Sequence, residues 1–300
     1  GTPFVPEGAY GPGTGGGGKC GFLYGPRFNI VNKEEKQQLY GNLTHDFSDA
    51  LSLTAELGWT HHEVKDNPQS PSYPALTFPT LLPGTAGSPF SVPVRWYGRP
   101  LGAEAPSPLA PRESDTLRAS LQLDGEFDGG WSWMGALTYS ENDREVYQPD
   151  TISSRLSAAL SGVGGPSGTE SFSPFDPSSN SPELIEWLSY QTFTNKKTDL
   201  TVADFVVSGD LFEMSAGPVG FAAGAQWREE SYSANRNELY TQSIDPATGA
   251  TIPVDLIFLG GGLPIDESRD SYAVFAEANF PLTSSLEANL AVRYEDLSSD

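Results

Sequence analysis

The glycine-rich segment GPGTGGGGKC, at residues 11–20, comes within one residue of a phosphate-binding loop. From Gly13 it fits the pattern G-x-x-x-x-G-K, and Cys20 stands where a Ser or Thr hydroxyl would hold a magnesium ion. Such a loop follows an apolar strand and opens a helix, because the helix N-terminus supplies the amide donors that hold the phosphate. The flanking segments GTPFVPEGAY and GFLYGPRFNIV fit neither element. The sequence therefore favours a glycine-rich surface segment over a nucleotide site.

The second group with ligand chemistry is the pair His61 and His62, which Glu63 follows. Imidazole and carboxylate both bind divalent ions. Successive side chains of a strand point to opposite faces, so the two imidazoles cannot easily share one ion. We interpret them as one residue on each face near the outer end of a strand, and we predict no metal site and no cofactor.

The sequence contains no recognisable set of catalytic residues. Serines are plentiful, but the three histidines, His45, His61 and His62, fall in predicted strands without a local nucleophile signature. The chain is therefore predicted not to be an enzyme.

Composition excludes two further classes of protein. The chain has 39 acidic and 17 basic residues, a net charge of −22 and a pI near 4.3, whereas nucleic acid binding needs a basic surface. No apolar run reaches the roughly 18 residues that a membrane-spanning helix needs. The 32 glycines and 25 prolines suit a loop-rich, all-β architecture.

A period-two alternation predicts the elements that position these groups. In LSLTAELGWTH the odd-numbered positions from Leu51 to Trp59 are apolar and the positions between them are small or polar, which indicates a strand with one apolar face. TLRASLQLDGEF and LEANLAVRYED repeat the pattern, and weaker copies follow elsewhere. We predict eight strands, at residues 37–47, 50–64, 115–127, 131–146, 198–213, 218–232, 270–281 and 286–297. Most reach the ~10 residues that cross a membrane at a tilt.

The connections between these strands alternate in length. Short links at SDA, DGG, SAGP and LTSS alternate with long loops at 65–113, 147–197 and 232–269. One end of the sheet should therefore carry tight turns and the other end large loops. Within the second loop, SPELIEWLSYQTF (181–193) predicts a short helix with Ser181 as its N-cap.

A soluble β-sandwich also has alternating strands, so the pattern has to be weighed against an outer-membrane barrel. Aromatic residues gather near the strand ends on the apolar side, for example Trp59, Phe127, Trp227 and Phe280, and the opposite sides carry many charges. Aromatic belts and a charged interior are typical of the barrel. The pattern favours the barrel over the sandwich.

Several phrases resemble the barrel domain of TonB-dependent receptors of the bacterial outer membrane. They are SGDLFEMSAGPVGFAAGAQWREES (208–231), DSYAVFAEANFPLTSSLEANLAVRYED (270–296), EEKQQLYGNLTHDFSDALSLTAELGWT (34–60) and SPFDPSSNSPELIEWLS (173–189). The resemblance implies an antiparallel 22-stranded transmembrane β-barrel with long extracellular loops, short periplasmic turns and a lumen closed by an N-terminal plug. Residues 1–300 are then expected to be part of that barrel, without plug, TonB box or C-terminal strands.

The function that the resemblance implies is TonB-coupled import of a scarce solute such as a siderophore, vitamin, saccharide or peptide. Expected partners are that ligand, a TonB-type energy transducer that acts through an N-terminal segment, outer-membrane lipid and lipopolysaccharide. A passive porin and a soluble sandwich that binds a ligand remain the alternatives. On the family topology Cys20 lies outside the cell, and we expect a disulfide with a cysteine upstream of residue 1.

Two groups of site residues follow from this topology. Ligand-binding candidates in the extracellular loops combine aromatic stacking surface with guanidinium donors; they are Arg95, Trp96, Tyr97, Arg99, Arg236 and Tyr240. Charged residues on the predicted lumen side are Arg118, Asp124, Glu126, Arg228, Glu230, Arg293 and Glu295. The lumen charges fit either contact with solute and plug or ladders between neighbouring strands.

Overall fold

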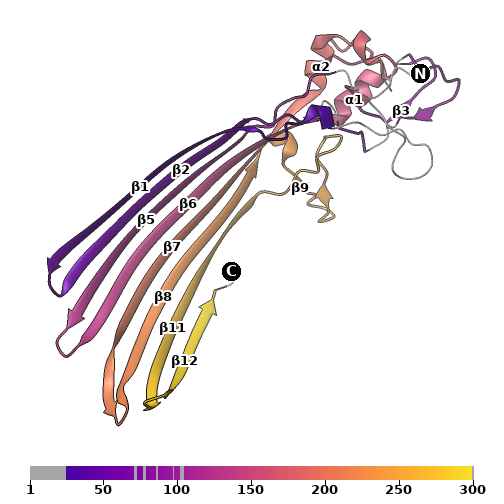
Figure 1. Ribbon diagram of the computed structural model, residues 1–300. Coiled ribbons are helices and arrows are strands. Elements are labelled where there is room, and N and C mark those ends of the chain that lie inside the picture. Colours follow the sequence, from indigo (N-terminus) through magenta and orange to yellow (C-terminus); the bar gives the residue numbers. More distant parts are fainter. Residues whose placement is uncertain are drawn as a thin grey trace.

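One antiparallel sheet of eight long strands dominates the computed structural model, which describes residues 25–70, 73–76, 79–85, 87–96, 98–101 and 105–298 (Figure 1). The long strands are β1 (Lys33–Ser48), β2 (Leu51–Asp66), β5 (Arg112–Phe127), β6 (Trp131–Thr151), β7 (Ser189–Met214), β8 (Gly217–Arg236), β11 (Ile265–Thr283) and β12 (Leu286–Leu297). Each pairs with its neighbour in sequence order, from β1 at one edge to β12 at the other. The sheet is therefore a meander of hairpins, with the short turns at one end and the long loops at the other.

The strands overlap the eight segments expected from alternation but extend further toward the long loops. The largest difference is β7, which begins at Ser189 rather than at residue 198 and pairs there with Thr151 of β6. The helix expected at 181–193 is correspondingly shorter and ends at Leu188. Ladder hydrogen bonds need no apolar side chains, so alternation gives no signal where the strands continue past the apolar part of the sheet.

The register is constant along the middle of every long strand, which keeps the two faces of the sheet distinct. Register shifts lie only near strand ends, between Lys33 and Glu34 and beside the short turns, as at Asp210/Glu213 and Pro281/Thr283. Odd-numbered residues of β1, β2, β5, β6, β7 and β8 consequently share one face. Trp227 pairs with Tyr272, so even-numbered residues of β11 and β12 join them. We call this the apolar face and the opposite side the polar face.

Aromatic residues border the apolar face at both ends. Toward the loops lie Trp59, Tyr139, Trp227, Tyr272 and Tyr294, and toward the turns lie Phe47, Phe127, Trp131, Trp133, Phe221 and Phe280. Aliphatic side chains between these belts stay open, with Leu121 at 52% and Val274 at 55% exposed. An apolar surface of this extent is typical of contact with lipid or with another apolar surface.

The long loops pack into a small core of their own at one end of the sheet (Figure 1). This loop cap comprises the described parts of residues 67–111 and 152–188 together with Ile257; it includes β3 (Thr80–Leu81), β4 (Val94–Arg95), α1 (Ser153–Leu160) and α2 (Pro182–Leu188). Its buried side chains are Ala75, Leu81, Trp96, Leu156, Ala159, Leu160, Phe172, Leu184, Leu188 and Ile257. Ser181 caps α2 by accepting the Leu184 N–H at 3.0 Å, as its sequence predicts.

The remaining elements are short. A two-stranded hairpin of β9 (Ser243–Ile244) and β10 (Thr251–Ile252) lies in the third loop, and single 3₁₀ turns occupy Gly25–Arg27, Pro177–Ser179 and Glu238–Tyr240. In the part of the chain that the structure describes, no helix has both the length and the apolar character needed to cross a bilayer.

Candidate functional site

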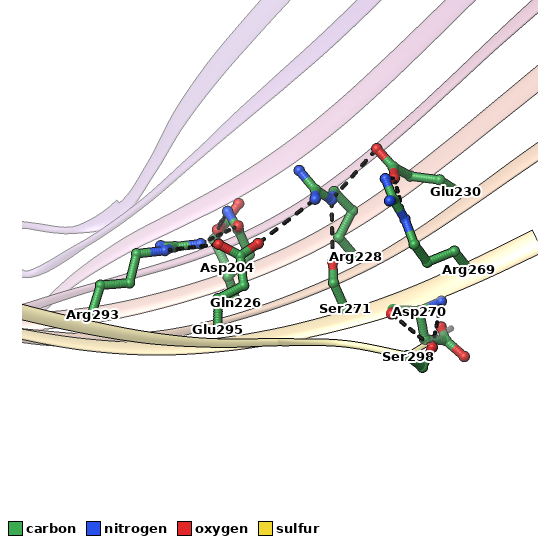
Figure 2. Close-up of polar contacts among 10 residues, drawn as sticks. All are labelled: Asp204, Gln226, Arg228, Glu230, Arg269, Asp270, Ser271, Arg293, Glu295 and Ser298. Atoms are coloured by element: carbon green, nitrogen blue, oxygen red, sulfur yellow. Dashed lines mark hydrogen bonds and ion pairs between the residues drawn. The ribbon is translucent and has the colours of Figure 1, made fainter. Parts of the chain in front are cut away.

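The polar face carries a network of arginines and carboxylates across β7, β8, β11 and β12 (Figure 2). Its members are Asp204, Gln226, Arg228, Glu230, Arg269, Ser271, Arg293 and Glu295, which we call the arginine network. These residues are even-numbered in β7 and β8 and odd-numbered in β11 and β12, so they all project from the polar face. Asp270 and Ser298 lie on the other side of the sheet.

Arg228 stands at the centre of the arginine network. Its Nε donates to Ser271 Oγ at 3.2 Å, and its guanidinium lies 3.6 Å from Glu230 and 3.7 Å from Glu295. Glu230 also pairs with Arg269. The polar side chains of three neighbouring strands are thus joined into one chain of contacts.

Arg293 continues the network toward the turn end. Its Nη2 donates to Gln226 Oε1 at 3.1 Å, and Nε lies 3.4 Å from Glu295. Gln226 Nε2 in turn donates to Asp204 Oδ1 at 2.7 Å. The network contains three arginines and three carboxylates, so its formal charges balance, although Asp204 is reached only through Gln226.

These ion pairs contribute little to stability because they remain open to solvent. The Arg228 and Arg293 side chains are 30% and 43% exposed. Exposed pairs contribute about 0–1 kcal/mol each, since solvent screens the charges and ordering long side chains costs entropy. The network therefore links neighbouring strands without adding much to the stability of the sheet.

Toward the other edge of the sheet, Arg118 of β5 pairs with a carboxylate of the neighbouring strand β2 rather than with Asp124 or Glu126 of its own strand. Its Nη1 lies 3.2 Å from Glu56 Oε2 on β2, and the Tyr40 hydroxyl donates to Glu56 Oε1 at 3.0 Å. Asp124 and Glu126, on the same strand as Arg118, instead line a hollow of about 650 Å³ near the short turns, together with Asp46. The sequence-predicted lumen residues all lie on the polar face, but they form separate groups.

Among the described candidates of the first long loop, Arg95, Trp96 and Arg99 do not share one exposed surface. Trp96 is 7% exposed and packs against Phe172 in the loop cap, with ring centroids 6.4 Å apart. Arg95 is exposed on β4, whereas Arg99 Nη1 donates to Ser70 Oγ at 3.3 Å. The indole that we expected to stack on a ligand thus fills the core of the cap.

The other loop residues have mixed positions. Arg236 Nη1 donates to the Leu263 carbonyl at 2.7 Å, which ties the end of β8 to the third loop, and Tyr240 lies partly buried in the adjacent 3₁₀ turn. Tyr97 and Cys20 lie outside the described residues, so the ligand role of one and the disulfide of the other stay predictions.

A cavity of about 340 Å³ opens where the loops meet β6 and β7. Its lining includes Tyr73, Pro149, Asp150, Ile185 and Tyr190. The sequence pattern did not indicate this cavity, because its walls come from four separate stretches of the chain. Its mixed apolar and polar lining is of the kind that receives a small ligand.

Asp150 is the buried acid of this cavity. Only 7% exposed, it accepts backbone N–H groups from Thr151 at 2.7 Å, Leu259 at 2.7 Å and Phe258 at 3.3 Å. The residue lies well beyond the loop-side aromatic Tyr139 of the same strand, outside the part of β6 that lies between the two aromatic belts. Burial raises the pKa of Asp150 to about 6, although the three amide donors pull that pKa downward.

The two neighbouring histidines lie on opposite faces, as strand geometry requires. His62 Nε2 lies 2.8 Å from Glu34 Oε2 of β1, and His61 Nδ1 lies 3.0 Å from Asp115 Oδ1 of β5. Adjacency in the sequence identifies only Glu63 as a carboxylate next to the two histidines. The cross-strand carboxylate beside His61 becomes visible only once the register is known.

Similarity to known proteins supports the same class of fold. The chain resembles the ferripyoverdine receptor of the outer membrane of Pseudomonas aeruginosa bound to ferripyoverdine, with a TM-score of 0.51 and 14% identity over 88% of this chain and 30% of that chain. The structure of an FpvAI–pyocin S2 complex matches with a TM-score of 0.51 and 13% identity over 88% of this chain and 31% of that one. This chain thus spans about a third or less of these relatives. A comparison with curated protein sequences gave no significant match.

A meander with an apolar face between two aromatic belts and a charged opposite face defines the wall of a transmembrane β-barrel. The model of the family "TonB dependent receptor-like, beta-barrel" matches residues 72–300. The chain belongs to this family of bacterial outer-membrane transporters and receptors, which is not a family of enzymes.

Proposed function

We propose that the chain forms part of the wall and outer mouth of a TonB-dependent importer. The observation that carries the proposal is the pairing of a charged polar face with a folded loop cap at one end of the same sheet. A passive pore needs only the charged polar face, whereas a receptor also needs ordered loops that hold a solute. We propose further that the full-length protein has the family's plug and TonB box and that a TonB-type transducer drives it. Lipid and lipopolysaccharide would surround the barrel.

A scarce solute is the cargo of this proposal, with siderophores, vitamins, saccharides and peptides as the classes to test. Ferric siderophores make the first probe, since a ferripyoverdine receptor shares this fold. Arg95 is exposed at the cap and suits an anionic chelate, because a guanidinium donates two parallel hydrogen bonds to an anionic group. Arg236 and Tyr240 of the third loop are further contact candidates, as are Arg99 and Tyr97.

The test is uptake by cells that produce the full-length receptor as their only route for each labelled ferric siderophore. We expect saturable surface binding whether or not TonB is present, and accumulation inside the cell only when TonB and the proton-motive force are intact. Entry that rises linearly with solute concentration and ignores TonB would instead establish a passive porin.

Two adjacent substitutions separate ligand contact from folding of the cap. Arg95→Gln should weaken solute binding while the cap keeps its resistance to protease. Trp96→Ala should weaken both, because the indole is part of the cap core. If Arg95→Gln leaves the affinity for every anionic probe unchanged, Arg95 is not a ligand contact.

A further inference from the structure

We propose that His61, Glu113 and Asp115 form a binding site for a first-row divalent transition ion, with zinc as the probe, on the apolar side of the barrel wall just beyond its aromatic belt. The site is independent of the transport proposal, because it requires only the paired strands β2 and β5.

Cross-strand register brings these ligands together. His61 pairs with Asp115 and Glu63 pairs with Glu113, and all four residues have the parity of the apolar face. His61 Nδ1 lies 3.0 Å from Asp115 Oδ1 and 3.8 Å from Glu113 Oε1, and the ligand atoms of the three residues all lie within 4.8 Å of one another. Rotation of the carboxylates would bring them to the separations of a single coordination sphere, in which each ligand lies about 2.0–2.2 Å from zinc.

The ligand chemistry selects the class of ion. One imidazole with two carboxylates is a mixed nitrogen and oxygen set, which suits zinc and its first-row neighbours, whereas calcium and magnesium prefer oxygen alone. The carboxylate side chains are each 44% exposed, which leaves room for water at the remaining coordination positions.

The surroundings hold the imidazole in place and supply excess negative charge. Trp59, the belt residue two positions before His61, stacks on its ring at a centroid distance of 6.1 Å and an interplanar angle of 13°. On the neighbouring strand β6, Asp143 and Glu145 pair with Asp115 and Glu113 and share their face. A bound cation would reduce the repulsion among these carboxylates.

The position in the wall explains how such a site is compatible with a membrane. Because Trp59 marks the loop-side belt, His61 lies one step beyond it, at the level of lipid headgroups rather than acyl chains. The nearby Lys65 Nζ lies 2.7 Å from Glu63 Oε2, so its direct ion pair is with Glu63, although its charge also acts on Glu113.

The experiment titrates zinc into the chelator-treated, full-length receptor in detergent, with a parallel cobalt titration followed by visible absorption. We expect one site in the wild type, weakened at least about tenfold by His61→Gln and by Asp115→Asn, because even outer-sphere substitutions cost roughly 10–100-fold in metal affinity. His62→Gln is the matched control, since that residue adjoins His61 in sequence but faces Glu34 on the opposite side. It should leave the site intact.

A hydrogen-bonded ion pair of His61 with its carboxylates is the competing account of the same geometry. It predicts no stoichiometric zinc binding and no ligand-field spectrum of cobalt, and that result would overturn the site. Equal loss of affinity in His61→Gln and His62→Gln would overturn it as well. Heat-modifiable migration on gels verifies folding of each variant, and Asp115→Asn keeps the test valid if His61→Gln fails to fold.

Discussion

Burial of Asp150 makes the stability of the surrounding loops depend on pH. Its pKa of about 6 lies above the unfolded value near 3.8, so between these two pH values the folded chain holds more of the proton than the unfolded chain does. The contribution of Asp150 to stability is therefore complete below about pH 4, falls as the pH rises through about 6, and is constant above that. The whole change is on the order of 2–3 kcal/mol, at 1.36 kcal/mol per pKa unit.

We expect Asp150→Asn to remove this pH dependence. The amides of Phe258 and Leu259 donate to the Asp150 carboxylate, so their hydrogen exchange, corrected for the intrinsic effect of pH, reports the local stability directly. In the wild type their protection should decrease from pH 4 to pH 7, and in the variant it should stay level. A wild-type protection that rises over this range would contradict the raised pKa.

Gly224 lies on the polar face at a point where neighbouring groups leave no room for a side chain. A Cβ atom at this position would lie 2.5 Å from the Phe275 ring and 2.6 Å from the Phe205 carbonyl oxygen, whereas one at Gly220, on the same strand and face, would meet nothing within 4 Å. Gly224→Ala should therefore cost about 1–3 kcal/mol by overpacking. Gly220→Ala should be nearly neutral or slightly stabilising, and urea unfolding of the refolded receptor measures both.

The loop cap is an element with a core of its own, and Trp96 belongs to that core. Truncation of a large buried aromatic costs about 3–5 kcal/mol. Trp96→Ala should therefore loosen the cap while the sheet stays folded, which limited proteolysis of the intact receptor would detect as cleavage confined to the loops. Arg95→Gln, at the adjacent exposed position, should leave the digestion pattern unchanged; cleavage of equal extent in both variants would contradict the role of the indole.

The alternation of apolar and polar residues predicted the strands between the aromatic belts, where lipid requires one apolar face. It did not predict the strand ends beyond the loop-side belt, where no such requirement holds. The early start of β7 at Ser189 and the carboxylates that meet His61 depend on hydrogen-bond register, which a single sequence does not specify. Trp96 looked like a ligand contact because an aromatic residue in a polar loop has two uses, stacking on a solute or filling a local core. Ser181 and its helix were predictable because capping acts over only three residues.

Two adjacent residues offer a direct test of which face of the sheet meets lipid. Leu121 lies midway between the aromatic belts on the apolar face, and Gln122 follows it on the polar face. An arginine on the lipid side near mid-membrane costs about 2–4 kcal/mol, whereas an interior position tolerates it. Leu121→Arg should therefore lower the free energy of unfolding from bilayers by that amount, with Gln122→Arg close to wild type. The reverse order would invert the two faces.

The core of the loop cap draws on residues from Ala75 to Ile257, separated by most of the described chain. Because contacts between residues far apart in sequence form slowly, we expect these segments to meet after the hairpins between them have paired. The surface of the cap is consequently a discontinuous epitope. Antibodies raised against it should bind the assembled receptor on cells and fail on denatured blots, which would make them a probe of completed barrel biogenesis.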